Sequence, residues 1–231
     1  CERLLRPDCG AVGRIFESHQ GLLVNFGSND YLGLATHPEL RETAYEAAKR
    51  WGVGSGGSRL LGGDHQLFHQ FEEWFAQEKR RERALLFNSG FSANQAIAVA
   101  LASSHTTFLI DRLAHASIID GVRLSGAPFH RFRHNDLTHL EELLSRTEGE
   151  KIVWTESVFS MDGDRAPLVE ISRVSKRYSA LLVVDEAHAD GLFGERGGGV
   201  IEELSLQGEV DLALSTFGKA YGSFGAAVAG S

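Results

Sequence analysis

From residue 84 onward the chain alternates short apolar segments with segments of helical character. The strand-like segments are residues 84–88, 106–110, 128–132, 151–155, 181–185, 212–217 and 225–230. Short apolar strands joined by helical crossovers form a mostly parallel sheet with helices on both faces. With 231 residues, of which 42% are hydrophobic, the chain is long and apolar enough to bury a core around such a sheet. The pattern therefore predicts an α/β fold.

The first third of the chain has a different pattern. Residues 12–25 are typical of a β-hairpin, and residues 38–51 are helical in composition, with proline at the start. After a glycine-rich stretch, apolar residues recur at the spacing of one helix face and predict a buried stripe; they are Leu67, Phe68, Phe71, Trp74 and Phe75. We expect an N-terminal arm with its hairpin at 1–36 and one large domain at 37–231.

Polar residues follow five of the predicted strands directly. These positions are Ser89 and Gly90 and the ranges 111–115, 156–160, 185–188 and 216–219. Ligands of open parallel sheets bind along the carboxyl ends of the strands. We therefore expect these five loops to converge on one cleft.

The segment Asp185-Glu186-Ala187-His188 is open to two interpretations. It spells the DEAH box of nucleic-acid helicases, but the same residues at the end of an apolar strand also occur in enzymes that use pyridoxal 5′-phosphate. A helicase also needs a G-x-x-x-x-G-K-[ST] loop to hold nucleotide phosphates, and the sequence contains no match. The net charge of −8 also argues against a protein that neutralises many phosphates, so we expect no nucleic-acid partner.

Pyridoxal 5′-phosphate chemistry needs an amine for the cofactor aldehyde, a carboxylate for the ring nitrogen and a site for the phosphate. Lys219 and Asp185 supply the first two, because they follow neighbouring strands and open onto the same edge. The carboxylate keeps the ring nitrogen protonated, and the opposite charge holds the carboxylate ionised. The alternative for Asp185 is a helix N-cap. The alternative for Lys219 is a solvated surface charge, which its setting among glycines and small residues argues against.

The phosphate is expected at the start of the helix that follows the first of the apolar strands. Ser89, Gly90 and Phe91 open this helix, and its free N–H groups and positive end favour an anion. Thr216 would add a hydroxyl from the loop that carries the lysine. The alternative is an ordinary helix N-cap at Ser89.

Two of the ten histidines follow strand ends at the expected ligand edge. His115 and His188 have the chemistry to stack on a flat ring or to hydrogen-bond its phenolic oxygen. The other eight are expected to be surface or structural residues; they are His19, His37, His65, His69, His105, His130, His134 and His139. No H-x-x-E-H, H-E-x-x-H or C-x-x-C spacing occurs, so we expect no metal site.

Cys1 and Cys9 form neither a disulfide framework nor a metal-ligand pattern, which favours a reducing compartment, the cytoplasm. No apolar run is long enough for a membrane span, and no signal peptide is recognisable. The only methionine is Met161, and the last residues read like a strand with nothing after it. We therefore expect a piece of a longer protein, cut at both ends.

Taken together, these motifs resemble those of the α-oxoamine synthases, fold-type I pyridoxal phosphate enzymes that join an amino acid to an acyl thioester with loss of CO₂. The segments that carry the resemblance follow in order across nearly the whole chain; they are NFGSNDYLGLATHPEL, SGGSR, LLFNSGFSANQA, DRLAHASIIDG, RFRHND, ESVFSMDGDRAPL, VVDEAHADG and STFGKAYGSFGAAVAGS. The resemblance implies the large domain of an aspartate aminotransferase-like fold.

The resemblance also implies roles for the residues at the matching positions. Lys219 would be the Schiff-base lysine and proton shuttle, Asp185 the partner of the ring nitrogen, and His115 the ring that stacks on the cofactor. The remaining roles fall to smaller contacts: His188 and Ser160 at the phenolic oxygen, Ser89, Gly90, Phe91 and Thr216 around the phosphate, and Asn29 at the substrate carboxylate.

Within the family, the motifs are most similar to the biotin-pathway branch, which implies L-alanine and a pimeloyl thioester on coenzyme A or acyl carrier protein. Glycine-specific relatives carry Asn where this chain has Ala114. Another synthase of the family with glycine or serine as donor is the alternative. A noncatalytic partner subunit is a further one, but such subunits usually lack the lysine. Family sites are built between subunits, which implies a homodimer in which residues 54–58 approach the partner's cofactor.

The chain departs from the family at three places. After the DEAH residues the family usually continues with Gly or Ser and then Thr, whereas this chain has Ala189 and Asp190. Phe224 replaces a residue that is usually small. Relatives also continue into a C-terminal small domain, which we expect to be absent from this chain.

Overall fold

The computed structural model describes residues 15–18 and 21–231. The described residues form two compact units: one up to Leu67 together with Phe217–Ser223, the other Phe68–Thr216 together with Phe224–Ser231. Each unit is described by itself below. Cys1, Cys9 and residues 12–14 and 19–20 of the predicted hairpin, His19 among them, lie outside the described residues. The predicted division between residues 36 and 37 stays a prediction.

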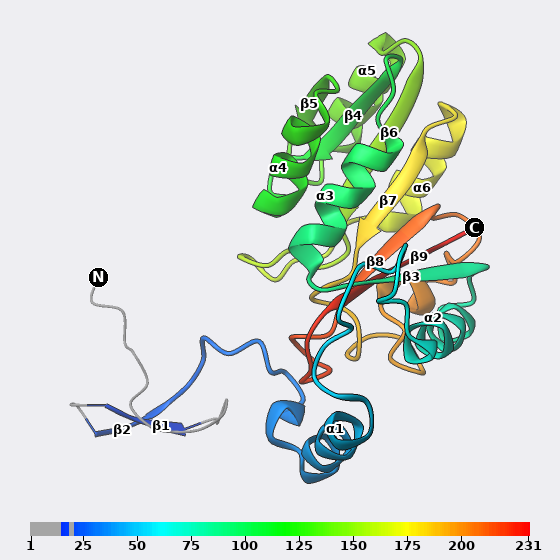
Figure 1. The fold of residues 1–231 in the computed structure, drawn as a ribbon. Coiled ribbons are helices and arrows are strands. Elements are labelled where there is room, and N and C mark those ends of the chain that lie inside the picture. Colours follow the sequence, from blue (N-terminus) through cyan, green and yellow to red (C-terminus); the bar gives the residue numbers. More distant parts are fainter. Residues whose placement is uncertain (1–14, 19–20) are drawn as a thin grey trace. The chain divides into compact units, whose positions relative to one another are not determined.

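The larger unit is built on a seven-stranded sheet in the order β3-β9-β8-β7-β6-β4-β5 (Figure 1). Its strands are β3 (Arg83–Phe87), β4 (Thr106–Asp111), β5 (Phe129–Phe132), β6 (Glu150–Glu156), β7 (Leu181–Asp185), β8 (Leu212–Thr216) and β9 (Ala226–Gly230). Only β9 runs against its neighbours, β3 and β8, so those two share the direction of the parallel strands β4 to β7. The predicted mostly parallel α/β fold is confirmed.

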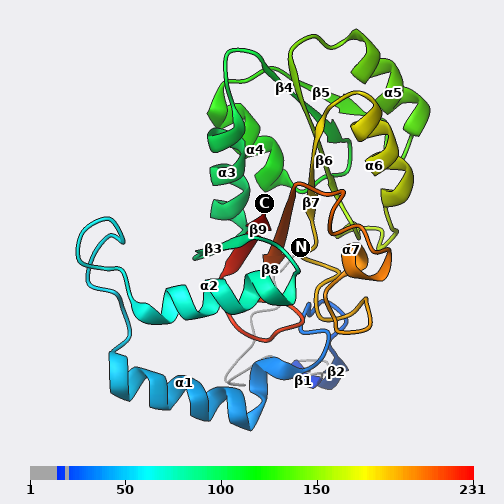
Figure 2. The ribbon, with the colours of Figure 1, turned by 90° about the vertical axis from the view of Figure 1, so that its right-hand side faces the viewer.

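Helices cover both faces of this sheet (Figure 2). One face carries α3 (Gly90–Leu101) and α4 (Ala116–Ser125), and the other carries α5 (Leu137–Arg146), α6 (Leu168–Arg177) and α7 (Val200–Glu203). No helix in the described part of the chain is both long and apolar enough to cross a membrane.

Side chains that alternate along the central strands build a separate core on each face. On β4, Phe108 and Ile110 pack under α3 and α4, while Leu109 packs on the opposite side; on β6, Trp154 and Val153 divide in the same way. All five are fully buried, and burying one such side chain contributes about 1.5–3 kcal/mol. Both faces of the sheet are therefore held firmly, which fixes where the strands end.

Helix α2 (Gln66–Glu78) forms as predicted, but the expected apolar stripe is only partly buried. Phe75 is 2% exposed, whereas Leu67 and Trp74 are exposed. The buried face includes Glu72 instead, because its Oε1 accepts a hydrogen bond of 2.7 Å from the Leu86 backbone N–H of the edge strand β3. The prediction of a buried stripe is therefore confirmed at Phe75 and wrong at Leu67 and Trp74.

The smaller unit contains an antiparallel pair, β1 (Ile15–Ser18) and β2 (Gly21–Val24), the short 3₁₀ helix η1 (Leu34–Thr36) and α1 (Pro38–Trp51). The predicted helix at 38–51 is confirmed, and the predicted hairpin is confirmed over β1 and β2. Proline at the first position of α1 fits there because that N–H has no helical partner.

The loop Phe217–Ser223 belongs to the smaller unit and packs on η1. A Cβ at Gly222 would lie 2.3 Å from the backbone nitrogen of Ala35, and Gly222 has a positive φ of 59°. Both the space and the backbone conformation therefore require glycine at this position.

Candidate functional site

Most of the predicted site residues of the larger unit lie where strands end, along the carboxyl edge of its sheet. Asp185 is the last residue of β7, in register with Glu156 on β6 and Leu214 on β8. Thr216 is the last residue of β8, and Ser89 follows β3 by two residues. The predicted convergence of these strand ends on one edge is thus present in the sheet.

The carboxylate of Asp185 is held from two sides. It is 4% exposed; Oδ1 accepts a hydrogen bond of 2.9 Å from the Ala187 backbone N–H, and Oδ2 accepts one of 3.0 Å from Asn94 Nδ2. The first bond closes a turn two residues on and caps no helix, so the N-cap alternative does not apply. A carboxylate that accepts at both oxygens has a fixed plane.

His115 is the N-cap of α4, and its ring is tied to the same helix. Nδ1 lies 2.7 Å from Ser117 Oγ and 3.2 Å from the Ser117 backbone nitrogen. The His115 backbone N–H donates to Glu156 Oε1 at 2.5 Å. His115 as a whole is exposed.

Asn94 and Ser117 connect these two predicted site residues. Asn94 Nδ2 bonds Ser117 Oγ at 2.9 Å as well as Asp185, and both Asn94 and Ser117 are 1% exposed. Neither was predicted as a site residue. The signal that could have revealed them is a polar side chain on the apolar face of each helix, next to Ala93 on α3 and Ile118 on α4.

The start of α3 comes very close to the end of β8. A Cβ on Gly90 would lie 2.6 Å from Thr216 Cγ2, so only glycine allows this approach. Ser89 is the N-cap and accepts a bond of 3.1 Å from the Ser92 N–H, while Phe91 is exposed. The N-cap alternative for Ser89 is confirmed, and it is compatible with an anion at the remaining N–H groups of the first turn.

Glu186 and Asp190 lie inside the protein behind this edge. Burial raises the pKa of Glu186 to about 8, and the charge of Asp190 adds to the rise. Asp190 pairs with Lys79 Nζ, which also donates to the Gly198 carbonyl at 3.0 Å. Lys79 thus neutralises Asp190, the extra carboxylate that follows the DEAH residues. Glu186 is 1% exposed, so it cannot position water for an exposed nucleotide, as the helicase interpretation requires.

His134 bridges two further loops at the edge. Its Nδ1 bonds Asp111 Oδ1 at 2.9 Å and its Nε2 bonds Asp164 Oδ2 at 2.8 Å, while the ring meets Phe159 edge-on at 4.4 Å. Burial alone lowers the pKa of His134, but the hydrogen bonds to Asp111 and Asp164 outweigh it, so the pKa is raised. A structural role for this histidine, one of the two predicted alternatives, is confirmed.

Two further predicted residues, Ser160 and His188, also follow strand ends. Ser160 is exposed in the turn between Val158 and Arg165, which form an isolated antiparallel bridge, and His188 is half-buried after the DEAH turn. Within the described ranges, no group of three or more His, Cys, Asp or Glu side chains is arranged to hold a metal ion.

Lys219 and Asn29 belong to the smaller unit. The loop that carries Lys219 is closed by backbone bonds from Gly222 N–H to the Lys219 carbonyl at 3.0 Å and from Ser223 N–H to the Phe217 carbonyl at 2.8 Å. Asn29 is exposed, and its Oδ1 accepts a bond of 3.3 Å from the Tyr31 hydroxyl.

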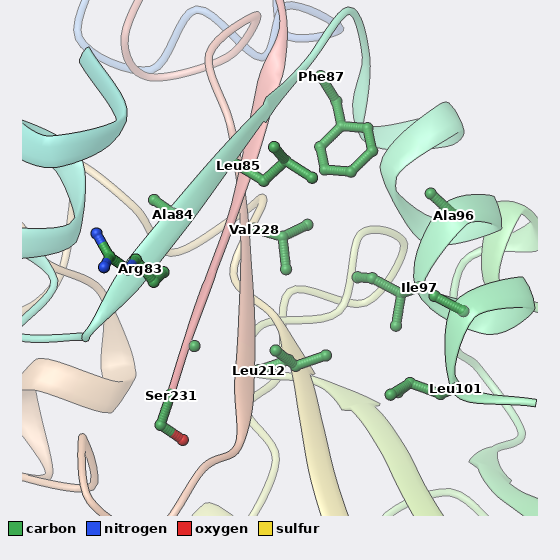
Figure 3. Close-up of a pocket in the computed structure, with 12 residues that line it drawn as sticks. Arg83, Ala84, Leu85, Phe87, Ala96, Ile97, Leu101, Leu212, Val228 and Ser231 are labelled. Atoms are coloured by element: carbon green, nitrogen blue, oxygen red, sulfur yellow. The ribbon is translucent and has the colours of Figure 1, made fainter. Parts of the chain in front are cut away.

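An apolar hollow of about 530 Å³ lies elsewhere on the larger unit, between α3 and the strands β3 and β9 (Figure 3). Leu85, Phe87 and Val228 face Ile97 across it, and Arg83 is its only titratable lining side chain. It lacks the polar groups that orient a reacting ligand, so it is separate from the candidate site.

The comparisons with known proteins agree with this geometry. Residues 22–231 match the family described as aminotransferase class I and II. An 8-amino-7-oxononanoate synthase of Geobacter sulfurreducens is 46% identical over 231 residues, which are 99% of this chain and 59% of that protein. The chain thus spans somewhat more than half the length of the curated relatives it matches, and others of the same name are 46–50% identical.

Solved structures of similar proteins share the fold. A Sphingomonas wittichii serine palmitoyltransferase superimposes with a TM-score of 0.90 at 35% identity, over 94% of this chain and 55% of that one. A structure of SPT with its PLP internal aldimine superimposes with a TM-score of 0.89 at 34% identity, with the same coverage of 94% and 55%. The sheet edge described above thus lies in a fold that in that relative carries a pyridoxal phosphate.

Proposed function

The chain belongs to the class I and II aminotransferase family, and from this premise we propose that it forms the pyridoxal phosphate-binding part of a cytoplasmic enzyme that joins L-alanine to a pimeloyl thioester with loss of CO₂. This is the reaction we assign to 8-amino-7-oxononanoate synthases, whose curated members match at 46–50% identity, above the 34–35% of the two serine palmitoyltransferase structures described. The observation that carries the proposal is the buried Asp185 carboxylate, oriented at both oxygens on the ligand edge of the sheet.

The residues at this edge fit pyridoxal 5′-phosphate. Asp185 would face the ring nitrogen, and an ionised carboxylate with a fixed plane is suited to hold an N–H⁺ group. The phosphate would meet the N–H groups at the start of α3, beside Ser89, Gly90, Phe91 and the Thr216 hydroxyl. The close approach of Gly90 to the Thr216 methyl group brings the start of α3 and the end of β8 together, which supports one phosphate contacted by both. When bound, the cofactor supplies an electron sink for negative charge on the α-carbon of the amino acid.

Lys219 would supply the amine for the cofactor aldehyde and would move the proton at the substrate's α-carbon in its unprotonated form. Chain connectivity supports this role. Lys219 follows the last residue of β8 by three positions, so its Cα lies within about 11 Å of the Thr216 Cα, at about 3.8 Å per step. Leu214 on the same strand is in register with Asp185.

The other predicted residues would complete the site. We propose that His115 stacks on the cofactor ring, that His188 and Ser160 contact the phenolic oxygen, and that Asn29 binds the substrate carboxylate. We also propose a homodimer in which residues 54–58 approach the partner's cofactor. Small-molecule substrates fit a site at the carboxyl edge of a parallel sheet.

Glycine or serine as donor is the alternative, and the similarity to serine palmitoyltransferases favours serine over glycine as the second candidate. The test is a screen of amino-acid donors against acyl thioesters of different chain length, scored by release of free thiol. The proposal predicts the highest turnover with L-alanine and pimeloyl thioester, loss of turnover in Lys219→Ala, and unchanged turnover in Lys176→Ala, a control on the surface. A clear preference for glycine or serine would contradict the assignment of the donor.

A further inference from the structure

Asn94 connects Asp185 and His115, the two side chains that the proposed function places at the ring of the cofactor. It bonds Asp185 directly and reaches His115 through Ser117. It lies on α3, is 1% exposed, and donates from Nδ2 to Asp185 Oδ2 at 3.0 Å and to Ser117 Oγ at 2.9 Å. An amide nitrogen carries two hydrogens, so both are used. The bond to Oδ2 makes Asn94 a side chain that holds the Asp185 carboxylate in place.

The orientation of the Asn94 amide is fixed by the carboxylate. Turned the other way, Oδ1 would face Asp185 Oδ2, and two acceptors at that distance repel each other. Asn94 Oδ1 is buried and has no hydrogen-bond partner in the described part of the chain, whereas most buried polar atoms have one. The protein therefore leaves one oxygen unsatisfied in order to direct both N–H groups of this amide.

The orientation of the Asn94 amide also affects which ring nitrogen of His115 carries a hydrogen. Ser117 Oγ accepts one N–H of Asn94, so its own hydrogen is free for its other neighbour, His115 Nδ1 at 2.7 Å. Nδ1 also accepts from the Ser117 backbone N–H at 3.2 Å. A nitrogen that accepts carries no hydrogen, so the neutral ring of His115 carries its hydrogen on Nε2.

The backbone holds this arrangement in place. A Cβ on Gly121 of α4 would lie 2.9 Å from Gln95 Cα and 3.0 Å from the Asn94 carbonyl of α3, so the two helices touch backbone to backbone at this level. The distance between Asn94 and Ser117 is therefore set by the helix packing and not by flexible side chains.

We propose that Asn94 is a positioning residue, which fixes at once the plane of the Asp185 carboxylate and the hydrogen placement on His115. The inference rests on the proposed function, in which Asp185 meets the ring nitrogen of the cofactor and His115 stacks on its face. One amide nitrogen then serves both contacts, because it donates to Asp185 directly and reaches His115 through Ser117 Oγ.

The first test uses the cofactor-free protein and ¹⁵N NMR of the histidine rings, which distinguishes Nδ1–H from Nε2–H. We expect the Nε2–H form for His115 in the unsubstituted protein and a smaller fraction of it in Asn94→Leu and in Ser117→Ala, where the backbone bond of 3.2 Å alone favours that form. Gln95→Leu, which removes the neighbouring amide on the same helix, keeps the Nε2–H form. The proposal is overturned if His115 carries its hydrogen on Nδ1, or if Asn94→Leu leaves its tautomer unchanged.

The second test measures the affinity for pyridoxal 5′-phosphate by absorbance. Asn94→Leu removes a hydrogen bond to a charged group and weakens binding roughly 10- to 100-fold, whereas Ser117→Ala keeps that bond and changes the affinity far less. Equal losses in the two variants would contradict the proposal. If the unsubstituted protein binds no pyridoxal phosphate, the proposed function fails, and the tautomer measurement alone decides on Asn94.

Asn94→Asp keeps the volume of the side chain and covers the case in which Asn94→Leu fails to fold. It places a second carboxyl against Asp185, so cofactor affinity falls at neutral pH and recovers in acid, where one of the two carboxyls carries a proton and donates again. An affinity loss that is the same at every pH indicates a merely structural effect and rejects the proposal.

Discussion

The buried ion pair between Lys79 and Asp190 gives the sharpest prediction about stability. The two side chains are 6% and 1% exposed, and Lys79 reaches Asp190 from just beyond the end of α2, 111 positions earlier in the chain. Burial raises the pKa of Asp190, and the Lys79 charge opposes that rise. Lys79→Met keeps most of the buried stem but removes the charge, which leaves Asp190 without its cation.

We expect this substitution to lower the free energy of unfolding by about 3–5 kcal/mol, the usual cost of breaking a buried ion pair on one side. That is a large share of a typical total of about 5–15 kcal/mol. Urea unfolding followed by circular dichroism measures it. Lys176→Met is the matched control, because Lys176 is 73% exposed in its pair with Glu209 and should cost less than about 1 kcal/mol.

The double variant Lys79→Met/Asp190→Leu separates the missing charge from the missing contact. Replacing both partners of a buried pair with apolar side chains of similar volume is often neutral, so the double variant should regain most of the lost stability. If Lys79→Met costs no more than Lys176→Met, or if the double variant is as unstable as the single one, the reasoning about the buried pair is refuted.

Three other predictions concern pH and backbone approach. Because the pKa of Glu186 is raised to about 8, the folded protein keeps a proton that the unfolded chain releases, and the contribution of Glu186 to stability falls as pH rises from about 4.5 to 8. Glu186→Gln should flatten this part of the curve of stability against pH. His134 has a raised pKa, so its contribution is full below about pH 6.5 and is lost as pH rises through the folded pKa; His134→Gln should remove that loss in thermal melts at several pH values. Gly90→Ala brings a methyl group to 2.6 Å from Thr216 Cγ2 and should weaken pyridoxal phosphate binding roughly tenfold or more, whereas unchanged binding would count against a phosphate at the start of α3.

Local patterns in the sequence were enough to predict the elements that position the site. The helix at 38–51, the alternation of strands and helices after residue 84 and the shared edge of the strand ends all follow from periodicity and from the geometry of parallel sheets. Asp185 was identified for the same reason, because a polar residue after an apolar strand marks that edge.

Contacts between distant residues were out of reach of the sequence. Asn94 meets Asp185 across 91 positions and Lys79 meets Asp190 across 111, and neither local segment says which residue the partner is. The prediction of which residues of α2 are buried was partly wrong for a related reason. Glu72 points inward because a backbone N–H of the edge strand needs an acceptor. Polar partners of buried groups are fixed by tertiary packing, which no periodicity reveals.

The central claim, that the Lys219 amine and the Asp185 carboxylate serve one pyridoxal phosphate, is tested most directly by borohydride reduction of the protein in the presence of the cofactor, followed by peptide mapping. The chain has five lysines, so the other four serve as internal controls; they are Lys49, Lys79, Lys151 and Lys176. The account predicts that the pyridoxyl label is confined to Lys219 and that Asp185→Asn weakens the labelling. Label spread over the other lysines, or a Lys219 that stays unmodified while the cofactor is bound, would contradict it.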